Sequence, residues 1–244
     1  MTGERRVDRG NGGANDVAIW HIDLAQHAAS EAHYWLMLSD AERTRAQRLK
    51  VSRKRTEYVV VRAMLRHCLA TQTACVPQAI EFAFAEHGKP FVRGHGVHFN
   101  VSHSHGYALI AIASGFEVGI DVEKVRPGVN SQRLARRFFS PLECQTLGEL
   151  AESDRARGFF TCWARKEAVI KCDGRGVSIG LDRFDVSIRA HEPARLLRTG
   201  WDTSVAEQWS LLNIDVGADF QAALAARTRS ICVTQRRLQP VSTN

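Results

Sequence analysis

A weak internal repeat constrains the fold of this chain most. The segment LSDAE (38–42) resembles FSPLE (139–143), and in each a serine followed three residues later by a glutamate predicts a capped helix start. A long amphipathic helix follows both segments, with Trp163 as far behind the second serine as Arg62 is behind the first. The repeat predicts two similar halves that meet at a cleft, which is a usual place for a ligand.

The apolar pattern mixes short strands with longer helices. We expect strands at 17–24, 80–85, 97–101, 107–113, 118–123, 183–189, 208–215 and 219–225. We expect helices at 39–50, 53–70, 131–138, 141–151 and 154–172. Because strand and helix do not alternate strictly, the predicted class is α+β rather than a doubly wound sheet. The expected organisation is a disordered tail (1–16), an N-terminal half (17–116), a C-terminal half (117–234) and a second tail (235–244).

The composition is that of an ordinary soluble protein. The 244 residues are 44% hydrophobic and 24% charged, without an apolar run of roughly 18 residues that would cross a bilayer. The first residues lack the apolar core of a signal peptide, so we expect a cytoplasmic protein with no membrane partner. The six cysteines are far apart and form no CxxC pair. We expect most of them to be reduced and buried rather than zinc ligands or disulfides.

The net charge of +7 favours anionic partners. Many basic residues fall between Arg43 and Arg66, and most of these we interpret as a solvated helix face. Nucleic acid, a polyphosphate cofactor and an acidic protein are all consistent with the charge alone.

Two carboxylates lie close together in GIDVE (119–123). Alternate residues of a strand share a face, so Asp121 and Glu123 project together while Ile120 and Val122 face the core. Paired carboxylates stay ionised most easily beside a cation, and hard oxygen ligands suit Mg²⁺. Solvated acids at a strand end are the alternative, because this short motif is weak by itself.

A second segment, WARKEAVIK (163–171), predicts a helix stripe. Trp163, Glu167 and Lys171 recur at four-residue spacing and therefore share one face. An exposed Glu–Lys pair is the common explanation of such spacing. The large aromatic residue on the same stripe instead indicates partial burial, and a buried acid and base need partners such as a metal and a phosphate.

A third segment, FNVSHSH (99–105), ends a strand in hydroxyl and imidazole groups that suit a phosphate. The alternative is a zinc site, whose candidate ligands are His95, His98, His103 and His105. Their spacing fits no familiar zinc motif, and zinc here would leave Asp121 and Glu167 without a role, so we favour the phosphate.

Together these segments resemble the motifs of the Sfp-type 4′-phosphopantetheinyl transferases, which activate carrier proteins of polyketide, fatty-acid and non-ribosomal peptide synthesis. NVSHS, GIDVE and WARKEAVIK followed by GRG carry the resemblance, and HGKP (87–90) and RFFSPLE (137–143) match further family segments in the same order. The similarity extends from about Leu38 to about Leu181.

The resemblance implies two pseudo-twofold-related α+β halves with coenzyme A between them, in agreement with the internal repeat. It implies that Asp121, Glu123 and Glu167 hold Mg²⁺ against the pyrophosphate. The residues implied to bind coenzyme A are Arg55, Arg62, Lys89, Ser102, His103, Lys166 and Lys171. Family members differ at the position of Val122, which offers no polar side chain, so a ligand there would be backbone or water.

The implied reaction is attack of a carrier-protein serine on the β-phosphate of coenzyme A, with 3′,5′-ADP leaving. Lys171 would stabilise or protonate the leaving phosphate, and Glu167, Glu143 or a metal-bound water would deprotonate the serine. The implied partner is an acidic acyl or peptidyl carrier protein, which a basic surface would attract. Chain length favours a monomer that contains both halves.

Two other functions compete with this one. A nucleic-acid or nucleotide-binding module explains the basic helix but leaves the paired acids unexplained. Another Mg²⁺-dependent phosphotransferase is possible in principle, but the sequence lacks GxxxxGK[ST]. We therefore expect no nucleic-acid partner.

Overall fold

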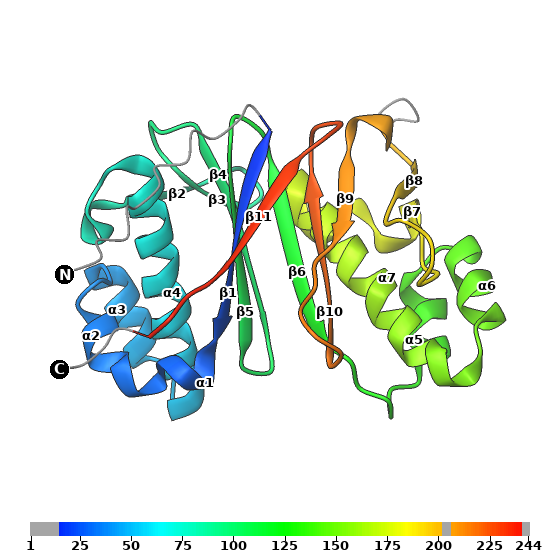
Figure 1. Cartoon of the computed structure of the whole chain (residues 1–244), viewed down its shortest axis with the longest axis horizontal. Coiled ribbons are helices and arrows are strands. Elements are labelled where there is room, and N and C mark those ends of the chain that lie inside the picture. Colours follow the sequence, from blue (N-terminus) through cyan, green and yellow to red (C-terminus); the bar gives the residue numbers. More distant parts are fainter. Residues whose placement is uncertain (1–14, 202–205, 241–244) are drawn as a thin grey trace, which may run out of the picture.

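The computed structural model describes residues 15–201 and 206–240 (Figure 1). The strands are β1 (Asp16–Asp23), β2 (Phe82–Phe84), β3 (Pro90–Val92), β4 (Val97–Ser104), β5 (Tyr107–Ser114), β6 (Val118–Lys124), β7 (Phe184–Val186), β8 (Leu196–Thr199), β9 (Ser210–Asn213), β10 (Phe220–Ala226) and β11 (Cys232–Arg237). The helices are α1 (Leu24–His27), α2 (Glu31–Trp35), α3 (Asp40–Gln47), α4 (Ser52–Thr73), α5 (Ser131–Phe138), α6 (Pro141–Glu149) and α7 (Glu152–Asp173). This mixture confirms the predicted α+β class.

Two sheets lie between two long helices (Figure 1). The first sheet has the order β11-β1-β5-β4 and the second β6-β10-β9. Helix α4 covers the outer face of the first sheet, and helix α7 covers the outer face of the second. Each predicted half therefore contributes one helix-covered sheet; the twofold relation between the halves stays a prediction.

The core follows the alternation of the strands. Ile110 and Ile112 of β5 pack toward α4, whereas Leu109 and Ala111 pack against the second sheet. Since successive strand residues face opposite sides, the near-continuous apolar run of β5 fills both layers. The inner faces of the two sheets share one apolar cluster, which holds the halves together.

Both predicted helix starts are confirmed as capping boxes. Ser39 accepts from the amide of Glu42, and Ser140 accepts from the amide of Glu143, while each glutamate accepts from the amide of its serine. Several expected elements are shorter than predicted. The expected strands 183–189 and 208–215 shrink to Phe184–Val186 and Ser210–Asn213.

The greatest difference from the sequence expectation lies in residues 232–237. The predicted tail from residue 235 is wrong in part, because strand β11 continues to Arg237. It pairs in parallel with β1, with Asp16 opposite Cys232 and His21 opposite Arg237. The end of the C-terminal half thus completes the sheet of the N-terminal half. Residues 1–14 of the expected tail at 1–16 lie outside the described residues. The tail prediction ends one residue late, because strand β1 already begins at Asp16.

None of the described helices is long and apolar enough to cross a membrane. The cysteines are all unpaired. The expected burial holds for Cys68, Cys162 and Cys172, whereas Cys232 on β11 is exposed.

Candidate active site

A pocket of about 390 Å³ lies where β4, β6 and α7 meet. The residues that line it are Val101, Ser102, His103, Asp121, Glu123, Trp163, Glu167 and Lys171. Each of the three sequence segments singled out above contributes to it. The structure therefore brings together the three predicted metal ligands and three of the residues implied to bind coenzyme A.

The acids face helix α7 because of the strand period. Ile120 and Val122 are buried between the two sheets, so Asp121 and Glu123 point to the other face of β6, as predicted. The Val122 side chain, only 1% exposed, offers nothing to the pocket. Gly119 lies on the same face as the acids, and a Cβ there would come within 2.1 Å of the Ala168 carbonyl oxygen. The glycine allows α7 to approach β6 closely.

Asp121 lies at the centre of the pocket. Its Oδ1 accepts hydrogen bonds from Ser102 Oγ at 2.8 Å and from Lys171 Nζ at 2.6 Å. Its Oδ2 is buried and has no hydrogen-bond partner. A buried carboxylate oxygen without a partner is costly, so it marks a place for a further positive group.

The other two acids are hard to ionise in this arrangement. Burial and the neighbouring charge of Asp121 raise the pKa of Glu123 to about 7. The same two causes, in the same order, raise the pKa of Glu167, while Lys171 opposes them. Arg126 and Lys171 also oppose the rise at Glu123, but they do not cancel it. A cation bound among the three carboxylates would favour their ionised forms.

The donor set therefore fits a hard divalent cation. It consists of carboxylate oxygens in a polar pocket, which is the ligand chemistry of Mg²⁺. In the described part of the chain, no three side chains of His, Cys, Asp or Glu lie close enough together to hold a metal ion as they stand. Asp121, Glu123 and Glu167 line one pocket but would have to move closer together to bind it. The four histidines considered as zinc ligands do not converge on one point either. His98 Nδ1 is bonded to Glu117 instead.

A larger pocket, of about 1080 Å³, adjoins this one. It lies between α3, α4 and the β2–β3 hairpin, and His103 lines both pockets. Arg45, Lys54 and Arg62 also line it, and within the described residues Arg45 and Lys54 form no ion pair. The guanidinium of Arg62 lies 4.0 Å from the ring centroid of Phe82. The pocket thus combines basic groups with aromatic faces.

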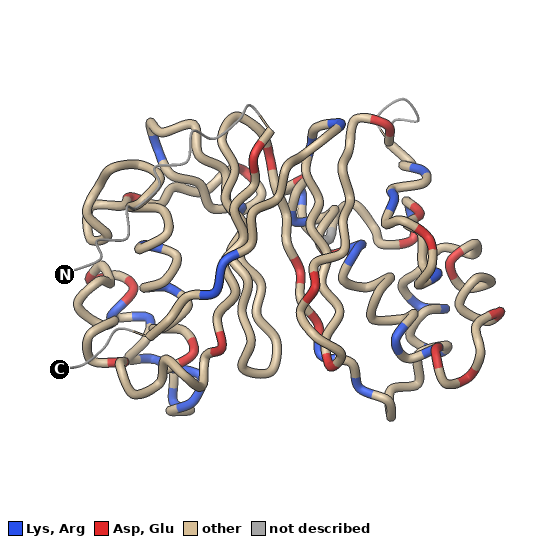
Figure 2. Tube along the Cα trace, viewed as in Figure 1, with Lys and Arg blue, Asp and Glu red and all other residues tan. Residues whose placement is uncertain are grey.

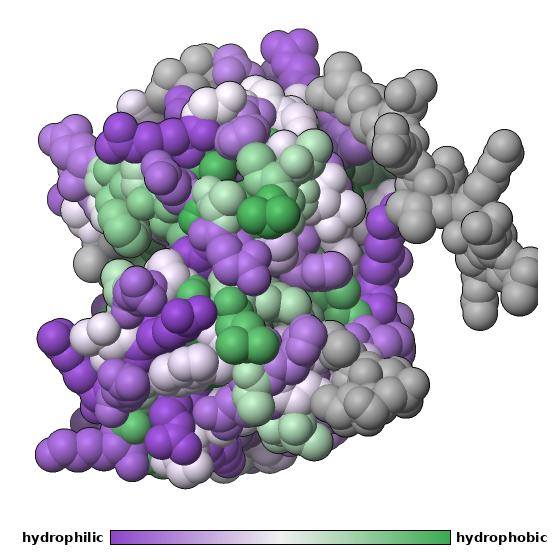
Figure 3. Space-filling view, turned by 90° about the vertical axis from the view of Figure 1, so that its left-hand side faces the viewer, coloured by the Kyte–Doolittle hydropathy of each residue, from purple (hydrophilic) through white to green (hydrophobic). Residues whose placement is uncertain are grey.

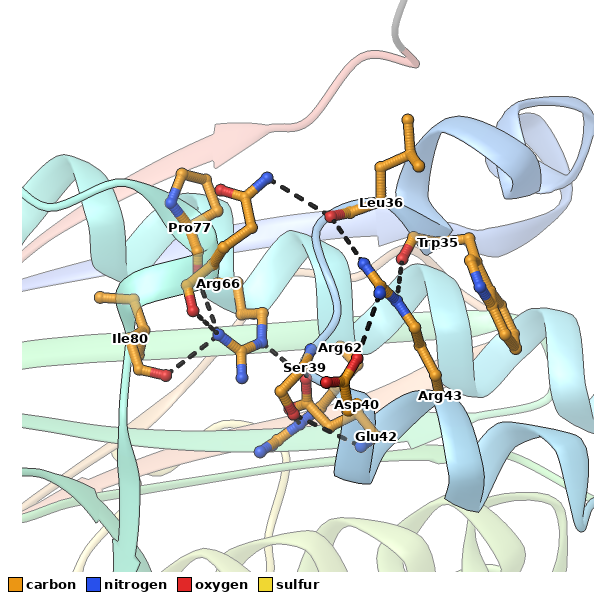
Figure 4. A network of polar contacts seen from close by, with 11 residues as sticks. Trp35, Leu36, Ser39, Asp40, Glu42, Arg43, Arg62, Arg66, Pro77 and Ile80 are labelled. Carbon is orange, nitrogen blue, oxygen red and sulfur yellow. Dashed lines mark hydrogen bonds and ion pairs between the residues drawn. The ribbon is translucent and has the colours of Figure 1, made fainter.

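Glu42 anchors the basic wall of the larger pocket (Figure 4). Its two carboxylate oxygens accept from Arg62 Nε at 2.5 Å and from Arg66 Nε at 2.6 Å. Arg66 is buried and also donates to the carbonyl oxygens of Pro77 and Ile80. Arg55 does not line either pocket and pairs with Glu31 at 3.5 Å.

Two implied site residues lie elsewhere. Lys166, on another face of α7, and Glu143 of α6 are fully buried and bond each other at 2.7 Å. Lys166 also donates to the carbonyl oxygens of Leu181 and Phe184. Because α7 turns by 100° per residue, Lys166 cannot share the face of Lys171. The structure thus brings neither residue to the acid pocket.

Lys89 is also outside the acid pocket. Its ammonium donates to the carboxylate of Glu117 and to the carbonyl oxygens of Val118 and Cys172, at 3.1 and 2.9 Å. An ammonium has three donors, so all of them are used within the protein. Lys89 joins the loop before β3 to β6 and to the end of α7.

Five of the nine basic residues between Arg43 and Arg66 form ion pairs with acids among the described residues. Asp40, Glu57, Glu31 and Glu42 pair with Arg43, Arg53, Arg55, Arg62 and Arg66. Figure 2 shows basic and acidic residues interspersed along the helices on both sides of the molecule. On the outer face of the N-terminal half, apolar patches lie between hydrophilic side chains (Figure 3).

Comparison with known proteins identifies the family of the chain. Residues 117–225 match the model of the 4′-phosphopantetheinyl transferase superfamily, and residues 27–115 match that of the N-terminal region of 4′-phosphopantetheinyl transferases. The chain is 31% identical over 216 residues to the 4′-phosphopantetheinyl transferase HetI of Nostoc sp., covering 87% of this chain and 88% of that protein. The chain belongs to the 4′-phosphopantetheinyl transferase superfamily.

Other superfamily members are similar over shorter stretches. The 4′-phosphopantetheinyl transferase Sfp of Bacillus subtilis is 34% identical over 134 residues, or 54% of this chain and 58% of that protein. The crystal structure of the holo-[acyl-carrier-protein] synthase of Thermotoga maritima matches 47% of this chain and 64% of that chain, with 19% identity and a TM-score of 0.38. As a superfamily member, the chain is a transferase enzyme.

Sequence reasoning missed some site residues of this transferase. The sequence predicts Glu42 only as a helix cap and Arg66 only as part of a charge run, whereas Glu42 bonds both Arg62 and Arg66. The internal repeat gives only a partial signal for them, because its register aligns Lys166 with Leu65, one residue before Arg66. The capping-box glutamate of the second half, Glu143, pairs with Lys166 of the following long helix, just as Glu42 pairs with Arg66.

Proposed function

We propose that this enzyme transfers the 4′-phosphopantetheine group from coenzyme A to a serine of an apo acyl or peptidyl carrier protein, with Mg²⁺ as cofactor and 3′,5′-ADP as the second product. The observation that supports this most directly is the meeting of an acid pocket and a basic, aromatic-lined pocket at His103. Such a pair suits a long substrate with a metal-bound pyrophosphate and an anionic nucleotide end.

Asp121, Glu123 and Glu167 would hold the magnesium ion. The free Oδ2 of Asp121 and the raised pKa values of the two glutamates support this assignment. When bound, Mg²⁺ neutralises the charge that develops on the pyrophosphate during transfer.

Lys171 and Glu167 have separate tasks in the proposed mechanism. Lys171 lies at the pocket with 28% of its side chain exposed, and its ammonium stabilises the leaving phosphate. Glu167 takes the proton of the carrier serine, directly or through water, because it is the carboxylate that helix α7 contributes to the pocket. Glu143 was the alternative base, but its place in the interior does not favour this role.

The larger pocket would bind the nucleotide end of coenzyme A. Arg62, Arg45 and Lys54 supply positive charge for its phosphate, and Phe82 supplies an apolar face. Arg55 does not line this pocket, which makes it a weaker candidate than the resemblance implied.

The decisive experiment is to incubate the protein with coenzyme A, Mg²⁺ and an apo carrier protein and to weigh the carrier. A mass gain equal to phosphopantetheine is expected, and its absence with several carriers would refute the proposal. Asp121→Ala and Glu167→Ala should each abolish the gain while the far-UV circular dichroism stays that of the wild type. A variant that kept its activity would remove its residue from the metal site.

We further propose that a monomer acts on an acidic carrier, attracted by the basic residues left unpaired in the 43–66 region. Association with the carrier should then weaken as ionic strength rises. Binding that is equal at low and high salt would argue against this surface.

A further inference from the structure

Strands β4 and β6 lie side by side without a main-chain ladder. Each is an edge strand of its own sheet among the described strands. An edge strand leaves alternate amide and carbonyl groups without partners. Along β6, the amides of even-numbered residues point away from β10, and three of them find acceptors on β4.

Side chains of β4 take the place of a partner strand. Asn100 Oδ1 accepts from the amide of Ile120 at 3.0 Å. Ser102 Oγ accepts from the amide of Val122 at 3.2 Å, and Ser104 Oγ accepts from the amide of Lys124 at 3.3 Å. These three β4 residues alternate with Val101 and His103, so they share one face of their strand.

Two lysines satisfy carbonyl groups on the same edge. Lys89 Nζ donates to the carbonyl oxygen of Val118 at 3.1 Å, and Lys171 Nζ lies 3.4 Å from that of Ile120. The edge of β6 that faces β4 is thus hydrogen-bonded by side chains instead of by a strand.

The ladder also reaches the acids of the pocket. Ser102 Oγ donates to Asp121 Oδ1 at 2.8 Å, and Ser104 Oγ lies 3.4 Å from Glu123 Oε2. Ser102 Oγ accepts a second hydrogen bond, from Lys171 Nζ at 3.2 Å. A serine hydroxyl has one donor and two acceptor sites. Those of Ser102 are all occupied by Asp121, Val122 and Lys171, which leaves none for a phosphate.

We infer that Asn100, Ser102 and Ser104 are positioning residues: their side chains lock β6 of one half to β4 of the other and thereby fix Asp121 and Glu123 for the metal. For Ser102 this replaces the role in nucleotide binding that the resemblance implied. The metal part of this inference rests on the proposed function, whereas the ladder itself does not.

Amide hydrogen exchange, measured by NMR on the full chain without metal or coenzyme A, tests the ladder. Asn100→Leu should speed exchange at Ile120, and Ser102→Ala at Val122, by about fivefold or more, the loss of one hydrogen bond. The amides of Asp121 and Glu123, which face β10, should keep their wild-type rates. Asn100→Asp retains the acceptor oxygen and should restore protection at Ile120. Ser114→Ala, at an exposed position at the end of β5, is the control for a simple loss of serine.

Unchanged exchange at Ile120 and Val122, or equal acceleration along all of β6, would overturn the ladder. Mn²⁺ titration is the second readout: Ser102→Ala should weaken Mn²⁺ binding by about 10-fold. A loss of coenzyme A binding with normal exchange at Val122 would overturn the positioning role. If the wild type bound no Mn²⁺, the proposed metal site would fail, and the exchange data would still decide the ladder.

Discussion

At the scale of single residues, two lysines of helix α7 lie in opposite environments, one at the acid pocket and one in the core. Lys171 lies at the pocket, bonded to Asp121 at 2.6 Å. Lys166 is 0% exposed, and its ammonium lies 4.1 Å from the ring centroid of Phe184 and 2.7 Å from Glu143. Burial makes the second lysine a structural group, because an ion inside the core is tolerated only with its counter-charge.

Replacing each lysine by methionine separates the structural role of Lys166 from the active-site role of Lys171. Lys166→Met leaves the Glu143 carboxylate buried without its counter-charge, so we expect a loss of about 3–5 kcal/mol in the free energy of unfolding. Lys171→Met should cost less stability than Lys166→Met, because the Lys171 side chain is 28% exposed and Asp121 keeps its hydrogen bond from Ser102. It should lower kcat by about 100-fold or more. Urea unfolding and the carrier-mass assay measure the two effects. Normal stability with lost activity in Lys166→Met would return that residue to the active site.

At the scale of elements, the site depends on how closely α7 approaches β6. Gly119 faces the backbone of Ala168 and Cys172, at 2.1 Å and 2.3 Å from a would-be Cβ. The same two elements hold Asp121 and Glu167, so the distance between strand and helix sets the distance between the acids.

Gly119→Ala should therefore damage both fold and site. A methyl group there must push α7 away from β6, which should cost about 1–3 kcal/mol and weaken Mn²⁺ binding measurably. Thermal melting and Mn²⁺ titration are the measurements. Gly128→Ala is the matched control, because a Cβ at Gly128 meets nothing within 4 Å. Equal behaviour of the two variants would show that the close approach is unimportant.

The elements also show what the sequence could predict. Period-two and period-3.6 patterns correctly placed Asp121, Glu123, Glu167 and Lys171 on shared faces, since these periods are local properties of the backbone. They could not tell that Lys166 is buried, because its partner Glu143 belongs to another helix. Strand β11 was missed for a similar reason. Its sequence, CVTQRR, has little apolar alternation, and it pairs with a strand far away in the chain.

At the scale of the whole molecule, a polar cluster joins the halves beside the inter-sheet core. Glu117, at the start of the C-terminal half, bonds both Lys89 and His98 of the N-terminal half. Burial opposes ionisation, but the hydrogen bonds from His98 and Lys89 lower the pKa of Glu117 to about 2. The carboxylate therefore stays ionised well below the usual range.

This lowered pKa predicts how stability depends on pH. The folded state keeps Glu117 ionised where the unfolded state binds a proton, so its contribution is complete above about pH 4.5 and is lost as the pH falls toward 2. Glu117→Gln should remove that part of the acid sensitivity and lower stability at pH 7. Urea unfolding of both proteins between pH 2.5 and 7 measures it, and parallel curves would contradict the prediction.

The pairing of β1 with β11 bears on how the protein folds during synthesis. The first described strand cannot gain its outer neighbour until residue 237 has left the ribosome, although β5 is available to it long before. Until then β1 presents an open edge to other nascent chains, and closing so long a loop slows folding. The N-terminal half should consequently reach its final stability only after translation of the C-terminal half, which makes the growing chain a natural client of chaperones that shield strand edges.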